Sequence, residues 1–200
     1  MSAQPLEESP PPWQPDPIRQ RLANHTLEDL LNLPPDAPRV ELVDGVIHVV
    51  PSPTVGHQDL SFLVCAWLRA HAPTGYRASM AVGVALAGNA SREPDVVLRR
   101  ANADLSASLL MPHEVILAVE VVSPGTKRTD RLMKPAEYAA AEIPCYWRIE
   151  QDPVHLYAYR LGGRSGPTGY REYELVTESA ELIELEQPFP IKLPIAEITP

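Results

Sequence analysis

Two acidic residues interrupt apolar stretches that otherwise have the pattern of buried β-strands. Asp95 follows Pro94 and precedes the apolar residues 96–98, and Glu120 lies within the apolar run 116–122. A charge inside a buried strand is costly unless a partner neutralises it, and a divalent cation is a common partner of clustered carboxylates. The pair therefore predicts a site on two neighbouring strands, and Mg²⁺ chemistry on phosphate is the leading interpretation.

The same two carboxylates have a plainer interpretation. As a pair at strand ends they could be satisfied by backbone N–H donors or by the guanidinium groups of Arg92 and Arg128. The pattern alone leaves this alternative open.

Length and composition favour a single globular domain. The chain has 200 residues and is 44% hydrophobic, which is sufficient for a sizeable core. Residues 1–24 are rich in proline and polar side chains, so we expect a flexible arm followed by one domain over residues 25–200. Cys65 and Cys145 lack metal-ligand spacing and are expected to be buried free thiols. Without a signal-peptide pattern or a long apolar run, we expect a cytoplasmic protein with no membrane contact.

The net charge of −9 at first argues against a nucleic-acid partner, because phosphate contacts come from Lys and Arg. The excess acid lies at the two ends, however, and residues 31–171 hold 14 acidic and 14 basic side chains. Four of these basic residues follow the strand of Glu120: Lys127, Arg128, Arg131 and Lys134. A basic patch beside the carboxylates and an ordinary solvated helix start fit this cluster equally well.

Hydrophobic periodicity predicts a mixed α/β order. Asp44-Gly45 is suited to a tight hairpin turn, residues 99–113 form a polar loop, and Gly162 to Gly169 read as a flexible hairpin connection. The expected helices span 26–32, 56–71 and 130–141, and the expected strands span 40–43, 46–50, 76–86, 94–98, 115–122, 146–149 and 156–161.

An ordered set of motifs runs through about residues 25–190. Its members are Val40-Glu41-Leu42-Val43-Asp44-Gly45, His57, Pro94-Asp95-Val96, Glu120-Val121-Val122-Ser123-Pro124, Asp130, Lys134, Tyr138 and Tyr146-Trp147. Taken together, these motifs resemble the bacterial Uma-two family of restriction-endonuclease-like proteins, within the PD-(D/E)XK nuclease superfamily.

The resemblance implies a restriction-endonuclease-like core, in which helices flank a central mixed β-sheet, and hydrolysis of DNA phosphodiester bonds. Asp95, Glu120 and the backbone carbonyl of Val121 would hold one or two Mg²⁺ ions, with Mn²⁺ as an alternative ion. The bound metal would polarise the scissile phosphate and lower the pKa of the attacking water. No small-molecule cofactor is expected.

The lysine that most of the superfamily places two residues after the glutamate is absent, since Val122 occupies that position. The family resemblance implies that Lys134, from the following helix, takes its place as a catalytic residue. A spacing of four puts Asp130, Lys134 and Tyr138 on one helical face. Pro135 disfavours helical geometry in the residue before it, so the helix could begin at Pro135 and leave Lys134 outside. Milder departures are Met111-Pro112 and Glu142, where the family often has glycine.

Several other residues are candidates for the site. Glu41 would complete the carboxylate cluster, as a third ligand or by holding water, although an exposed strand glutamate is the plainer interpretation. His57 could support the metal site or contact phosphate, and Tyr138 could orient Lys134, although solvation and core packing are the simpler roles. Asp130 and Arg128 complete the set of supporting or substrate-contacting candidates.

Three functional hypotheses remain. The first is a Mg²⁺-dependent DNA endonuclease, expected to act as a homodimer because cutting both strands pairs two active sites. The second is a nuclease-like fold retained as a DNA-binding or protein-interaction module, with weak or no catalysis. The third is a purely structural homodimer formed through exposed strands.

Overall fold

A six-stranded mixed sheet forms the centre of the computed structural model, which describes residues 13–165 and 170–200. Its strand order is β11-β10-β9-β8-β6-β3, and β8 and β9 are parallel whereas the other neighbours are antiparallel. β8 is buried along its whole length, which agrees with its apolar composition. The strands are β3 (Tyr76–Met80), β6 (Val96–Arg100), β8 (Val115–Val121), β9 (Cys145–Gln151), β10 (Val154–Ser165) and β11 (Tyr170–Ser179).

One face of this sheet is covered by α3 (Val55–His71) and, further along, by the hairpin of β12 (Leu182–Leu185) and β13 (Ile191–Pro194). The 3₁₀ turn Ile195–Glu197 follows this hairpin. α3 begins after the cap residue Thr54, whose hydroxyl accepts a hydrogen bond from the His57 amide. Its buried side chains recur at helical spacing, as the sequence predicts. The apolar ones include Leu60, Val64, Trp67 and Leu68.

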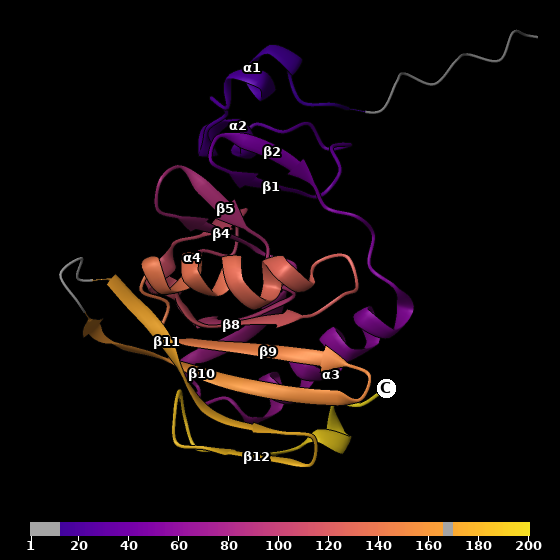
Figure 1. Cartoon of the computed structure of the whole chain (residues 1–200), viewed down its shortest axis with the longest axis vertical. Helices are drawn as coiled ribbons and strands as arrows, with labels where there is room; N and C mark the ends of the chain where they lie inside the picture. The colour runs from indigo at the N-terminus through magenta and orange to yellow at the C-terminus, as the bar shows by residue number, and fades with distance from the viewer. Residues whose placement is uncertain (1–12, 166–169) are drawn as a thin grey trace, which may run out of the picture.

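The opposite face packs against α4 (Lys134–Ala140) and a second sheet of five short strands with the order β2-β1-β5-β4-β7. In Figure 1, α4 lies between this second sheet and the central strands β8 and β9. The site described below is formed where the two sheets meet. The strands of the second sheet are β1 (Val40–Val43), β2 (Val46–Val49), β4 (Gly83–Leu86), β5 (Ala90–Arg92) and β7 (Leu109–Leu110).

The predicted hairpin and the short helix before it are confirmed. β1 and β2 pair across Asp44-Gly45, both of which have positive φ angles of 49° and 76°. A side chain at Gly45 would meet the Ala23 carbonyl oxygen at 1.9 Å, so glycine is required here for space as well as for conformation. α2 (Leu27–Leu31) begins with the expected capping box between Thr26 and Asp29.

The expected arm of residues 1–24 is only partly described, because residues 1–12 lie outside the described ranges. Its later part differs from the prediction, since α1 (Pro17–Leu22) is capped by Asp16. The Gln20 side chain pairs with both backbone groups of Ile47, on β2, at 2.6 and 3.0 Å. A polar cap followed by proline favours a helix start, and this signal outweighs the proline-rich composition.

Other boundaries were predicted less well. The expected strand 76–86 is divided into β3 and β4 at Ala81, whose φ is 48°. The expected loop 99–113 contains β7 and the start of a 3₁₀ turn at Pro112–Glu114. β10 extends to Ser165, and residues 166–169 of the predicted connection lie outside the described residues. No helix in the described ranges is both long and apolar enough to cross a membrane.

α4 ends in a closure at Glu142, a position where the resemblance implies glycine. The Glu142 amide donates to the Ala139 carbonyl and the Ile143 amide donates to the Tyr138 carbonyl, which are the two bonds of a Schellman motif. Glu142 accordingly has a φ of 60°, a conformation that favours glycine. The glycine common in the resembled family therefore suits this position better than the glutamate of this chain.

Candidate active site

A cleft of about 530 Å³ opens between the two sheets. One wall is the β1–β2 hairpin with the segment 51–53, and the other is the helical segment that leads into α4. Asp95, Glu120 and Val121 lie at its floor, where the start of β6 meets the end of β8. The predicted placement of the two carboxylates on neighbouring strands is therefore observed: Val96 pairs with Val119, the residues next to them.

Glu120 is the most buried carboxylate of the cleft, with 1% of its surface exposed. Its Oε2 lies 2.9 Å from the Lys134 Nζ, and its Oε1 accepts a 2.6 Å hydrogen bond from the Tyr138 hydroxyl. Both partners come from α4, so this helix satisfies the charge that β8 carries into the core. The Lys134 ammonium also lies 3.4 Å from Asp130 Oδ1 and 3.5 Å from Glu41 Oε1.

Lys134 lies inside a continuous helical segment, contrary to the expectation that Pro135 could leave it outside. Residues Thr129–Met133 form a π-helical turn that passes directly into α4, and the Lys134 amide donates to the Thr129 carbonyl five residues back. Pro135 occupies the first turn of α4, where a missing N–H is tolerated. The wider π turn therefore reconciles the proline with an inward-facing Lys134.

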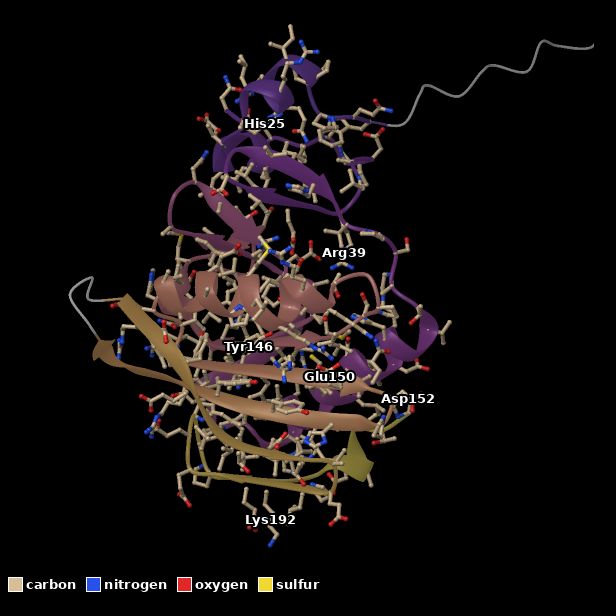
Figure 2. All side chains as sticks on the ribbon, viewed as in Figure 1. His25, Arg39, Tyr146, Glu150, Asp152 and Lys192 are labelled. Atoms are coloured by element: carbon tan, nitrogen blue, oxygen red, sulfur yellow. The ribbon has the colours of Figure 1, made fainter. Side chains whose placement is uncertain are left out.

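The missing N–H of Pro135 has a visible compensation. In the register set by the Lys134–Thr129 bond, the next donor along the chain would be residue 135 and its acceptor the Asp130 carbonyl. Proline cannot donate, and the Tyr146 hydroxyl of β9 donates to this carbonyl instead, at 2.6 Å. Tyr146 is buried, and Figure 2 shows it under α4 in the middle of the molecule.

Glu41 is buried and belongs to the cluster, contrary to the plainer interpretation of an exposed glutamate. Its Oε2 accepts a 2.7 Å bond from the Arg92 guanidinium, and its Oε1 accepts a 3.2 Å bond from the Glu93 amide. Arg92 also binds Glu137 on α4 through two bonds of 2.6 and 2.7 Å. The β1 carboxylate is thus tied to β5 and α4 by one guanidinium group.

Asp95 and His57 meet at the end of β8. Asp95 Oδ2 accepts a 2.8 Å bond from the Val121 amide and lies 3.2 Å from His57 Nε2. The same imidazole nitrogen lies 3.0 Å from the Val121 carbonyl oxygen. His57 is therefore buried against the two oxygens of the floor and does not have the solvated position that its place in a first helical turn suggests.

The pKa shifts follow from burial and from the crowding of charges. Burial raises the pKa of Glu120 well above its usual value, Lys134 lowers it, and the charges of Asp95 and Asp130 raise it further. Burial acts to raise the pKa of Glu41 too, but Lys134 and Arg92 outweigh this effect and its pKa is lowered. Burial acts to lower the pKa of Lys134, yet the surrounding carboxylates raise it above its normal value. Lys134 is therefore a fixed positive charge.

The oxygen donors of the floor suit Mg²⁺ better than they suit a metal that needs many protein ligands. Among the described residues, no three Asp, Glu, His or Cys side chains are grouped so that they could hold a metal ion unaided. Mg²⁺ is usually bound by one or two carboxylates together with water and substrate phosphate, so a smaller donor set is sufficient. Asp95 and Glu120 are close enough for their charges to interact, and Asp95 Oδ2 and the Val121 carbonyl oxygen lie 3.2 and 3.0 Å from the same nitrogen of His57. These residues fit the ion.

Of the site residues predicted from the sequence, all but Tyr138 and Arg128 line the cleft. Tyr138 is fully buried behind Glu120 and joins the cluster through its hydroxyl, whereas Arg128 is exposed and lies outside the cleft. Two participants were missed, namely Arg92 as a partner of Glu41 and Glu137 on α4. The available signals were their positions, because Arg92 lies two residues before Pro94-Asp95 and Glu137 lies three residues after Lys134. Sequence spacing alone does not show that these two side chains form an ion pair.

Comparisons with known proteins agree with this architecture. The sequence model of the Uma2 family, described as "Putative restriction endonuclease", matches residues 27–196. A crystal structure from Anabaena variabilis, described as a "putative nuclease belonging to DUF820", superposes with a TM-score of 0.64. It is 20% identical in sequence, and the match covers 86% of this chain and 96% of the other chain. At this identity the likeness establishes a shared fold. The comparison with curated proteins finds no match.

Proposed function

Because this chain belongs to the Uma2 family of restriction-endonuclease-like proteins, we propose that it is a Mg²⁺-dependent endonuclease that hydrolyses DNA phosphodiester bonds in the cleft. The observation that carries the proposal is the cluster at the floor, in which Asp95 just before β6 meets Glu120 near the end of β8 and Lys134 reaches Glu120 from α4. These are the residue types that phosphodiester hydrolysis requires, namely oxygen ligands for a cation and a fixed positive charge.

The charge of the cleft supports a role for a cation. Its lining includes five carboxylates and three Lys or Arg side chains, so phosphate alone would meet a net negative surface. Asp95, Glu120 and the Val121 carbonyl would hold the Mg²⁺. When bound, the ion supplies Lewis-acid polarisation of the phosphate and a lowered pKa for a water ligand.

The side chains of this chain have separate tasks in the proposal. A water oxygen bonds to phosphorus while the bond from phosphorus to the leaving sugar oxygen breaks, and in the net reaction one proton of the water passes to the leaving oxygen. Negative charge grows on the phosphoryl oxygens during this step. Lys134 is held protonated by its carboxylate neighbours, so it stabilises this charge or orients the water and does not act as a base. Tyr138 and Lys134 together keep Glu120 in place, and Glu41 helps to hold Lys134.

One feature favours a second candidate function. Each carboxylate of the cluster already has a partner within the protein: Lys134 for Glu120, the Val121 amide for Asp95 and Arg92 for Glu41. Such a site is stable without a metal ion, as a nuclease fold kept for binding DNA or protein would require.

The deciding experiment combines calorimetric titration of Mg²⁺ or Mn²⁺ with nicking of supercoiled plasmid, for wild type and Asp95→Asn. We expect wild type to bind the ion and to nick, and the variant to lose both while unfolding at a similar temperature. Glu184→Gln is the matched control, because Glu184 is an exposed carboxylate on β12, on the opposite side of the central sheet from α4 (Figure 1). Absence of ion uptake and nicking in folded wild type would favour the binding module.

A further inference from the structure

We propose that Arg92 is a positioning residue, which fixes α4 and Glu41 so that the Lys134 ammonium stays on Glu120. The inference rests on the proposed function and adds to it a residue that the sequence motifs do not identify. Arg92 lies at the end of β5, three residues before Asp95, and its side chain is 5% exposed.

The contacts of Arg92 connect three elements. Its Nε and one terminal nitrogen bind the two oxygens of Glu137 in a fork, and the other terminal nitrogen binds Glu41. The fork holds α4 to β5, and the third bond holds β1 to β5. A forked guanidinium–carboxylate pair fixes orientation as well as distance, which a single ion pair does not.

These contacts bear on Lys134 from two directions. Lys134 and Glu137 are three residues apart on α4, so the fork limits rotation and sliding of the helix that carries the ammonium. Glu41 uses one oxygen for Arg92 and places the other 3.5 Å from the Lys134 Nζ. A shift of Arg92 would therefore move both the base of the lysine side chain and one of its carboxylate neighbours.

Arg92 is poorly placed to bind substrate directly. Three of its five N–H groups already point at carboxylate oxygens, and little of its surface is accessible from the cleft. A lysine at this position would keep the positive charge but could not make the fork and the third bond together. Arg92→Lys therefore tests whether the site needs the three-bond geometry of the guanidinium group or only its positive charge.

The test compares Arg92→Lys and Glu137→Gln with wild type by steady-state plasmid nicking in Mg²⁺. We expect kcat to fall by about 10–100-fold in Arg92→Lys, as is typical when support of a site is lost, with KM nearly unchanged. Glu137→Gln keeps the side-chain shape and should show a smaller fall of kcat. The control is Arg19→Lys, which disturbs a comparable arginine–carboxylate fork to Asp29 in the α1–α2 region.

A second readout does not depend on catalysis. In metal-free protein, the ¹⁵N-edited NMR signal of the Lys134 ammonium, assigned with Lys134→Met, should be visible because the group is buried and hydrogen-bonded. We expect this signal to shift or broaden in Arg92→Lys and to stay unchanged in Arg19→Lys. If Arg92→Lys does not fold, Glu137→Gln supplies both readouts.

The outcomes separate the inference from the proposed function. An unchanged ammonium signal with unchanged kcat overturns the positioning role, and a raised KM with unchanged kcat assigns Arg92 to substrate binding instead. If wild type binds no metal and nicks no DNA, the proposed function fails, while the ammonium signal still decides whether Arg92 positions Lys134.

Discussion

Lys134 balances more negative charge than one side chain usually does, because the carboxylates of Glu120, Asp130 and Glu41 all lie within 3.5 Å of its ammonium. Its contribution to the stability of the fold is therefore the free energy that would be lost if those carboxylates stayed buried without a cation. Removing one partner of a buried ion pair typically costs about 3–5 kcal/mol. This one side chain therefore links the proposed catalytic cluster to the stability of the fold.

We expect Lys134→Met to lower the free energy of unfolding by about 3–5 kcal/mol near neutral pH. The folded-state pKa values of Glu120 and Asp130 are already raised by burial, and they rise further without Lys134. For such groups, stability is greatest below the unfolded pKa and is lost as pH rises through the folded pKa. The deficit should therefore shrink on acidification, as measured by urea unfolding at about pH 8 and about pH 5.

A deficit that stays constant with pH would show that lost packing, and not unpaired charge, explains the effect. Lys192→Met is the control, because Lys192 is 74% exposed beside Glu184. Exposed ion pairs contribute little, so this variant should stay within about 0.5 kcal/mol of wild type at both pH values.

The π turn is held to β9 in two ways, by the partly exposed pair of Arg131 and Glu150 and by the buried Tyr146 hydroxyl. Pro135 cannot donate to the Asp130 carbonyl, and Tyr146 takes over this bond. We expect Tyr146→Phe to destabilise the protein by about 1–3 kcal/mol, because a buried carbonyl loses its donor. Pro135→Ala restores an N–H at the position that the π register would use.

The double variant Pro135→Ala/Tyr146→Phe should consequently lose less stability than the sum of the two single variants. Thermal or urea unfolding of the four proteins forms a double-mutant cycle that measures this coupling. Strict additivity would mean that the new N–H does not reach the carbonyl, and that the π turn is fixed by other contacts.

The net negative charge of the cleft predicts that the affinity of the molecule for DNA depends on a divalent cation. Phosphate should approach the floor only when a divalent cation offsets the carboxylates of the lining. We expect the affinity for a short labelled duplex, measured by fluorescence anisotropy, to rise at least about tenfold when Ca²⁺ replaces EDTA, since Ca²⁺ takes the same oxygen ligands. Equal affinity in EDTA would contradict a cation-dependent site and support the binding module.

Much of this architecture could be predicted where a local signal is strong. The capping box at Thr26, the Asp44-Gly45 turn and the apolar face of α3 each have a local physical cause, and all three are confirmed. The carboxylate pair was placed correctly because strand order and punctuation brought Asp95 and Glu120 to one end of neighbouring strands.

The remainder depends on distant partners. β5 and β7 have only three and two residues, too few for a periodic pattern, and they form strands because the second sheet pairs them. The inward direction of Lys134 depends on a π turn that local propensity does not encode. Arg92 could not be assigned because its acceptors lie 51 and 45 residues away along the chain.

The bond from Tyr146 to the Asp130 carbonyl has a consequence for protein synthesis. A nascent chain that has emerged only to the end of α4 at Ala140 contains all the clustered side chains, from Glu41 to Tyr138, but not β9. Without β9, the parallel neighbour of β8 and the donor that completes the π turn are both missing. We therefore expect that the cleft assembles only after β9 has left the ribosome and paired with β8. A product truncated before β9 would not carry an assembled site.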